Sequence, residues 1–127
     1  MKKGPVVPAN SSPPLAPYSP GFIAGNVLYV GGTLPIAIDG STVAPGDVRT
    51  QTRFVLDTIE SVIKEAGGTM KDIVFNQIFI SDLADYAAMN EIYKIYFPEN
   101  PPARYCIRVD LVKPDFLVEI ASTVHLG

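Results

Sequence analysis

The sequence is poor in the residues that build metal sites and disulfide frameworks. Its 127 residues include one cysteine, one histidine and no tryptophan. A single cysteine, Cys106, cannot form an intrachain disulfide, and with one histidine it cannot supply a tetrahedral zinc site within a subunit. A Ser-His-Asp triad would have to use His125, two residues from the end of the chain. We therefore expect neither a metal site nor such a triad.

Charged residues are also scarce. They make up 18% of the chain, against about 25% in an average soluble domain, whereas apolar residues reach 47%. A chain of this size still exposes much of its area, so the shortfall of charge suggests apolar surface that another subunit covers. The 10 Lys and Arg against 13 Asp and Glu include no basic run that could follow a phosphate backbone. We expect self-association and no nucleic-acid partner.

No long hydrophobic run is present either. The longest candidate, residues 22–38, is interrupted by three glycines, an asparagine and a proline, and lacks the roughly 18 apolar residues of a membrane helix. No apolar segment follows Lys2 and Lys3 as it would in a signal peptide. The expectation is a cytoplasmic protein with one domain, residues 1–127, and no membrane contact.

Proline dominates the beginning of the sequence, with six prolines in the first twenty residues. They exclude regular helix and predict an extended, loop-like arm. Three short strands are predicted next, at residues 22–24, 27–30 and 34–36, and a loop follows at residues 38–45. The first two strands flank Gly25-Asn26, a pair suited to a tight hairpin turn.

A helix and a strand follow the loop. Apolar residues recur at spacings of three and four over residues 48–66, with Asp47 as a cap and Gly67-Gly68 as a stop. Residues 73–80 are too short and too β-branched for another helix, so they predict a strand.

A second helix begins after Ser81 or Asp82 and ends before Pro98. Its apolar and aromatic stripe predicts packing in the core and at an interface, through Tyr86, Met89, Ile92, Tyr93 and Tyr96. This order of elements predicts an α+β fold with two helices on one face of a mixed sheet. The other face is not visibly polar and would be open to other subunits.

Two alternating segments, residues 103–111 and 116–126, close the chain and predict a final hairpin. If its turn has an even number of residues, Glu119 shares a face with Arg104 and Cys106. Three groups would then converge: an arginine fork that can bind a carboxylate, a thiol, and a glutamate carboxylate that can orient a water. The same alternation is also typical of a solvated face with a cross-strand ion pair.

Two further features have an ordinary structural interpretation beside a functional one. Gly31 and Gly32 fit either the close approach of a ligand to the backbone or a bulge in the strand. A cysteine in a strand, such as Cys106, is by default an inert small residue.

Motifs spread in order along nearly the whole chain resemble one known family. They are residues 17–21 (PYSPG), 32–35 (GTLP), 90–93 (NEIY) followed by Phe97-Pro98, 102–107 (PARYCI) and 118–120 (VEI), and the helix at 51–68 also fits. The chain is similar through them to the reactive intermediate deaminase (Rid, YjgF-like) family. Residues 66–70 (AGGTM), 111–115 (LVKPD) and 117–121 (LVEIA) are most similar to its RutC-type branch, which serves pyrimidine utilisation.

The resemblance implies a chorismate-mutase-like α+β fold, assembled as a homotrimer with three clefts between subunits. It implies that Arg104 binds the carboxylate of the substrate and that Glu119 positions the hydrolytic water. It also implies that the cleft is lined by Tyr18, Cys106, Gly31 and Gly32.

The activity implied is that of an enamine/imine deaminase without a metal or organic cofactor. The preferred case is hydrolysis of 3-aminoacrylate to malonic semialdehyde and ammonia, with 2-aminoacrylate as a related substrate. Two departures from the family pattern bear on the substrate: Gly31 stands where many members have serine, and Asp110 where a small or basic residue is preferred. Two other functions stay open, a trimeric module that binds a small carboxylate without turnover, and the endoribonuclease or translation-inhibitor activity attributed to some members.

Overall fold

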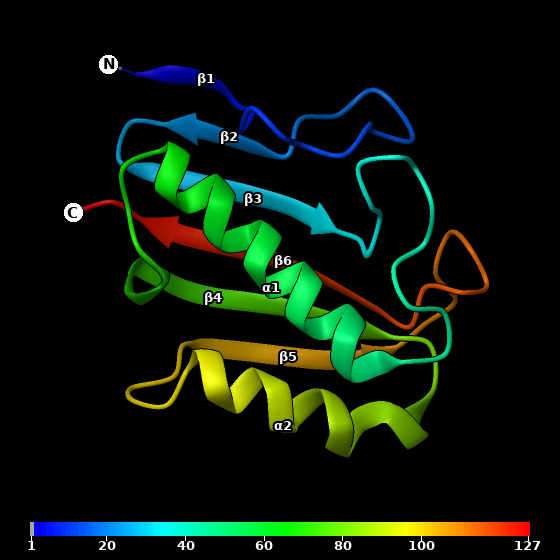
Figure 1. The fold of residues 1–127 in the computed structure, drawn as a ribbon. Coiled ribbons are helices and arrows are strands. Elements are labelled where there is room, and N and C mark those ends of the chain that lie inside the picture. Colours follow the sequence, from blue (N-terminus) through cyan, green and yellow to red (C-terminus); the bar gives the residue numbers. More distant parts are fainter. Residues whose placement is uncertain (1) are drawn as a thin grey trace.

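One six-stranded sheet carries two α-helices on a single face (Figure 1). The structure, a computed structural model, describes residues 2–127. Its elements in chain order are β1 (Lys3–Val6), β2 (Gly21–Ala24), β3 (Val27–Thr33), α1 (Val48–Glu65), β4 (Ile73–Ile80), α2 (Tyr86–Tyr96), β5 (Ala103–Arg108) and β6 (Val118–His125). The strands lie in the order β1-β2-β3-β6-β4-β5. All neighbouring strands are antiparallel except β4 and β5, which are parallel.

The predicted hairpin, first helix and fourth strand are confirmed. Gly25 takes a φ of 63° in the turn between β2 and β3, a conformation that glycine adopts without steric cost. Asp47 caps α1 by accepting a hydrogen bond from the backbone N–H of Thr50 at 3.1 Å. Gly67, with a φ of 89°, follows the helix end and stops it. Strand β4 has the predicted bounds.

The second helix is preceded by a short 3₁₀ turn, η2 (Leu83–Asp85), and Asp82 caps this turn by accepting a hydrogen bond from the N–H of Ala84. In Figure 1, α1 crosses the sheet diagonally and α2 runs beside the β5 edge. The apolar stripes of both helices face the sheet, and the core includes Leu56, Ile59, Ile63, Met89 and Tyr93 opposite Ile78 and Ile120. The expected α+β class, with two helices on one face of a mixed sheet, is therefore confirmed.

The N-terminal third differs from the prediction in two places. Lys3–Val6 form a strand, β1, rather than a structureless arm. Pro5 is compatible with this because β1 is an edge strand, where a missing N–H need not be paired. The strand predicted at residues 34–36 is reduced to one isolated bridge between Ile36 and Thr42.

The predicted final hairpin is wrong. Strand β5 pairs with β4 in parallel, and α2 forms the crossover between them. Strand β6 then passes to the middle of the sheet and pairs with β3 and β4. The two strands expected to pair are thus separated by β4.

The sheet face without helices carries large apolar side chains. Four of them are 41–52% exposed, namely Phe22, Tyr29, Tyr105 and Ile107. Phe75, Phe79 and Val27 occupy the same face by strand register. Within residues 2–127, no helix is both long and apolar enough to span a membrane.

Candidate active site

Arg104 lies on the helix-facing side of β5, between the sheet and α2. Its Nη2 donates hydrogen bonds to Oδ1 of Asn90 at 2.8 Å and to the hydroxyl of Tyr86 at 3.2 Å. The guanidinium carbon also lies 4.7 Å from the centre of the Tyr93 ring. Helix α2 therefore holds the guanidinium through an amide, a phenol and an aromatic face, all of which are neutral.

The charge of Arg104 has no partner of opposite sign in the described chain. The ion pairs within residues 2–127 are Arg49–Glu91 and Lys64–Glu60, both at the surface. Both N–H groups of the Arg104 Nη2 are engaged, whereas Nε and Nη1 have no hydrogen-bond acceptor among residues 2–127. An arginine held in this way presents a positive charge and unpaired donors to an external carboxylate.

Cys106 lies two residues after Arg104 on the same side of β5 and is partly buried. Burial raises the pKa of its thiol, and the nearby charge of Arg104 offsets this only in part. The thiol is therefore protonated at neutral pH and is a poor nucleophile. Its place beside Arg104 fits a residue that lines a site.

Glu119 points to the opposite face of the sheet, so one chain does not bring it together with Arg104 and Cys106. It pairs with Phe79 of β4, and Phe79 pairs with Ile107 of β5. Because side chains alternate along a strand, Arg104 and Cys106 face the helices while Ile107 and Glu119 face away from them. The predicted convergence on one patch is wrong for a single chain, since it assumed the final hairpin.

The carboxylate of Glu119 is partly buried against the backbone of Gly32. A Cβ built on Gly32 would lie 2.1 Å from Oε2 of Glu119, so only glycine leaves room for the carboxylate in this position. Burial raises the pKa of Glu119 above the usual value for glutamate. A carboxylate with a raised pKa is a stronger base than an ordinary glutamate, which suits it to proton transfer.

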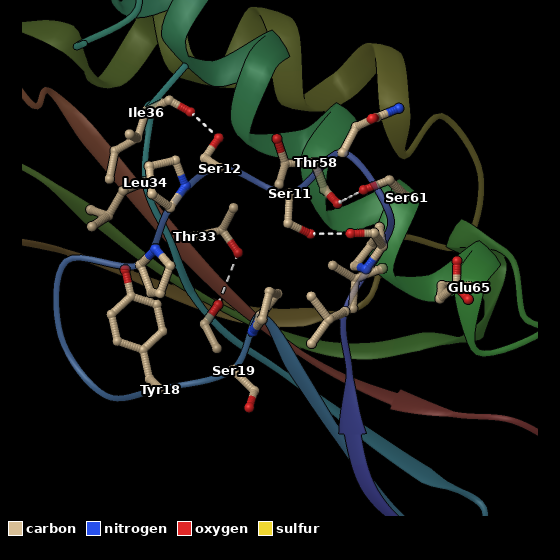
Figure 2. Close-up of a pocket in the computed structure, with 18 of the residues that line it drawn as sticks. Ser11, Ser12, Tyr18, Ser19, Thr33, Leu34, Ile36, Thr58, Ser61 and Glu65 are labelled. Atoms are coloured by element: carbon tan, nitrogen blue, oxygen red, sulfur yellow. Dashed lines mark hydrogen bonds between the residues drawn. The ribbon is translucent and has the colours of Figure 1, made fainter. Parts of the chain in front are cut away.

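Gly31 and Gly32 form an irregularity in β3, where the register with β6 shifts between Val30 and Thr33. The bulge interpretation of these glycines is therefore confirmed. Both also line a cavity of about 940 Å³ between the N-terminal segment and α1, shown in Figure 2. Tyr18 lies at its rim and is 46% exposed, and its hydroxyl accepts a hydrogen bond from the N–H of Leu15.

The candidate residues consequently form two groups. Arg104 and Cys106 lie under α2 at the β5 edge, whereas Glu119 contacts Gly32 on the far face. The cavity in Figure 2 is lined by Tyr18, Gly31 and Gly32, but not by the other three candidates. Residues 2–127 hold no cluster of three or more histidine, cysteine or acidic side chains placed to bind a metal ion.

Comparison with known proteins places this geometry in a family. The model of the family described as endoribonuclease L-PSP matches residues 9–126. The chain belongs to the endoribonuclease L-PSP family. A solved Rid-family protein from Yersinia pestis, YyfA, is 33% identical with a TM-score of 0.88, over 98% of this chain and 99% of that one.

Two Escherichia coli structures resemble this L-PSP family member to a similar degree. The YjgF gene product is 29% identical with a TM-score of 0.86, over 97% of this chain and 98% of that one. The protein TdcF, solved with bound serine, is 28% identical with a TM-score of 0.89, over 98% and 100% of the two chains. The family is thereby established over residues 9–126, and the fold over 97–98% of the chain.

The residues that hold Arg104 in this L-PSP protein were not predicted from the sequence. Tyr86 and Tyr93 were expected to be packing side chains, and no contact was expected for Asn90. A signal was available, because residues 86, 90 and 93 recur at spacings of four and three and therefore share one face of α2. An asparagine within an otherwise apolar stripe needs a polar partner, and Arg104 provides it.

Proposed function

We propose that this protein is a cofactor-independent enamine/imine deaminase that hydrolyses a small enamine acid to a carbonyl acid and ammonia. The observation that carries the proposal is Arg104, a guanidinium held by neutral groups with donors left for a substrate carboxylate. Membership of the family supports it, because Rid proteins are enamine/imine deaminases. Serine, the ligand of the related TdcF structure, also carries a carboxylate.

The proposed substrate is 3-aminoacrylate, which would give malonic semialdehyde, and 2-aminoacrylate is the closest alternative. Resemblance to the RutC-type branch through residues 66–70, 111–115 and 117–121 supports the first of these. Both substrates carry one carboxylate, which Arg104 would bind, and one enamine nitrogen, which would leave as ammonia.

The reaction asks for little more than positioning and proton transfer. The enamine is protonated on carbon to give an imine, water adds to the C=N bond, and ammonia leaves as the carbonyl forms. In our proposal Arg104 holds the carboxylate, and Glu119 orients the water and accepts its proton. The raised pKa of Glu119 supports this role, because the same group must both accept and return protons.

We further propose that the site is shared between subunits of a homotrimer. Arg104 and Glu119 lie on opposite faces of one sheet, so a complete site needs Arg104 of one subunit and Glu119 of a neighbour. The exposed aromatic and aliphatic side chains on the helix-free face are the surface such an assembly would bury. Light scattering at micromolar concentration should give about three times 13.7 kDa. A persistent monomer would contradict the shared site.

A second candidate function is endoribonuclease activity, which the description of the family names. The net charge of −3 speaks against it, because RNA binding draws most of its affinity from contacts with phosphates. A module that binds a small carboxylate without turnover is the other candidate, and Arg104 alone would suffice for it.

One assay separates these functions. Ammonia release is measured with 3-aminoacrylate and 2-aminoacrylate, each generated in the cuvette, with and without the protein. We expect the protein to accelerate release, and Arg104→Lys to reduce the acceleration. Binding of the inert carboxylate pyruvate without accelerated release would identify a binding module. Cleavage of RNA that survives both repurification and Arg104→Lys would identify the nuclease.

A further inference from the structure

We propose that Tyr93 is a positioning residue for Arg104, and that Asn76 and Ser122 fix the orientation of its ring. The inference rests on the proposed function, in which Arg104 binds the carboxylate of the substrate. It adds three residues from the interior of the fold, none of which is expected to touch the substrate.

The first observation is a polar row that runs across the sheet. Ser122 of β6 pairs with Asn76 of β4, and Asn76 pairs with Arg104 of β5, so the three side chains lie side by side on the helix-covered face. The next row on this face consists of Ile120, Ile78 and Cys106, and the row after it places Val118 and Ile80 beside the exposed Arg108. Of the buried polar side chains in residues 2–127, Asn76 and Ser122 are the two that lie in the sheet.

The second observation is that this row is hydrogen-bonded to the ring beneath Arg104. The Ser122 hydroxyl donates to Oδ1 of Asn76 at 2.5 Å, and Nδ2 of Asn76 donates to the hydroxyl of Tyr93 at 2.9 Å. The exposed fractions of the three side chains are 0% for Asn76, 4% for Ser122 and 6% for Tyr93. A buried hydrogen-bonded chain of this kind has one preferred arrangement, because breaking any link leaves a polar group unpaired.

The third observation is the geometry at the end of the row. The guanidinium carbon Cζ lies over the face of the Tyr93 ring, 4.7 Å from the ring centre. Asn90 and Tyr86 engage Nη2 from the side. These contacts reach the guanidinium from two directions, from the Tyr93 ring at Cζ and from Asn90 and Tyr86 at Nη2. The free donors on Nε and Nη1 then have fixed directions, so a carboxylate that accepts from either of them is bound at one place.

An apolar row would hold the sheet and α2 together at least as well. Buried polar networks are often neutral or unfavourable for stability when compared with apolar residues of the same shape. Stability therefore does not account for the polar row. Its hydrogen bond to Tyr93, which orients the aromatic ring beside Arg104, does.

The test replaces the whole row by apolar residues of similar shape, in the triple variant Asn76→Leu, Tyr93→Phe and Ser122→Ala. No polar group is left unpaired, so the melting temperature should stay close to that of the wild type. The aromatic ring at position 93 is retained as phenylalanine, but it no longer has a hydrogen bond to residue 76 of β4. We expect KM for 3-aminoacrylate, and the Kd of pyruvate as an inert probe, to rise about two- to thirtyfold, while kcat changes less.

Two single variants keep the test valid if the triple variant fails to fold. Tyr93→Phe should raise KM and Kd, whereas Thr52→Val, which removes a buried hydroxyl within α1, should lower stability without changing either. Ser122→Ala leaves the bond between Asn76 and Tyr93 in place and should give a smaller rise than Tyr93→Phe.

The outcomes distinguish this inference from the function on which it rests. An active wild type whose KM and Kd are unchanged in the triple variant and in Tyr93→Phe would overturn the positioning role alone. A rise that Thr52→Val reproduces would show a general effect of lost stability and would also overturn it. A wild type that neither binds pyruvate nor releases ammonia would overturn the proposed function and the inference together.

Discussion

Gly32 offers the sharpest single perturbation of the proposed water site. In the variant Gly32→Ala, the added Cβ would lie 2.1 Å from Oε2 and 3.1 Å from Cδ of Glu119. Ordinary contact begins near 3.4 Å, so the carboxylate oxygen must retreat by about 1.3 Å. The backbone of Gly32 does not have a positive φ, and alanine adopts it without strain. The change therefore acts on the position of the carboxylate rather than on the fold.

A displacement of about 1 Å in a reacting group can cost on the order of a hundredfold in rate. We expect kcat for ammonia release to fall about ten- to a hundredfold. KM should change much less, because Arg104 and its contacts lie on the other face of the sheet. Stability should be little affected, since alanine also restricts the unfolded chain by about 0.4–1 kcal/mol relative to glycine.

The matched control is Gly4→Ala, a substitution in β1 where the added Cβ meets nothing within 4 Å. It has the same effect on the unfolded chain and should leave kcat and KM unchanged. Steady-state kinetics and light scattering are measured on all three proteins. If Gly32→Ala keeps wild-type kcat in the same assembly as the wild type, the carboxylate of Glu119 does not take part in the reaction as proposed.

Three further predictions concern the titratable residues of the site. Arg104→Lys keeps the charge but loses the planar guanidinium and its fixed donors. It should lower kcat/KM about ten- to a hundredfold, whereas Arg108→Lys should change it little; equal small losses would mean that both arginines are merely solvated. Cys106→Ser and Cys106→Ala should retain most of the activity, because burial keeps the thiol protonated; complete loss in an intact assembly would instead indicate a nucleophilic thiol. The pH profile of kcat/KM should rise through a pKa above the ordinary glutamate value of about 4.3, since burial raises the pKa of Glu119 and the ionised form is the base. Glu119→Gln should remove this limb, and a limb that persists would assign the titration to another group.

The raised pKa of Glu119 also determines how this residue makes stability depend on pH. A raised pKa in the folded chain means that the folded state binds the proton more tightly than the unfolded state. The contribution of this carboxyl group to stability is therefore present below its unfolded pKa and is lost as the pH rises through the folded pKa.

Local patterns in the sequence sufficed for most elements of this fold. The spacing of apolar residues, the Asp47 cap and the Gly67-Gly68 stop determine α1 through contacts between near neighbours. Pro5 misled the prediction of β1, because a proline is acceptable in a strand that lies at the edge of a sheet, and edge position is not a local property.

Strand pairing is where local reasoning failed, and the candidate site was affected directly. Alternation correctly placed Arg104 and Cys106 on one face of β5, but it contains no information about which strand pairs with which. A strand, a helix and a second strand, as in β4, α2 and β5, favour a parallel pair through a helical crossover. That pairing leaves β6 between β3 and β4 and turns Glu119 to the other face. Recognition of the crossover would have predicted two half-sites instead of one patch.

The central claim is that one cleft takes Arg104 from one subunit and Glu119 from the next, and mixed trimers test it most directly. Arg104→Lys and Glu119→Gln chains, each with its own tag, are refolded together, and trimers that carry both tags are purified. In a ring of three, every mixed trimer then contains one cleft with both native residues, so about one third of the wild-type kcat should return. Every chain in the mixture still carries a lesion. Mixed trimers as inactive as the two parents would therefore show that the site lies within a single chain, and would contradict the account.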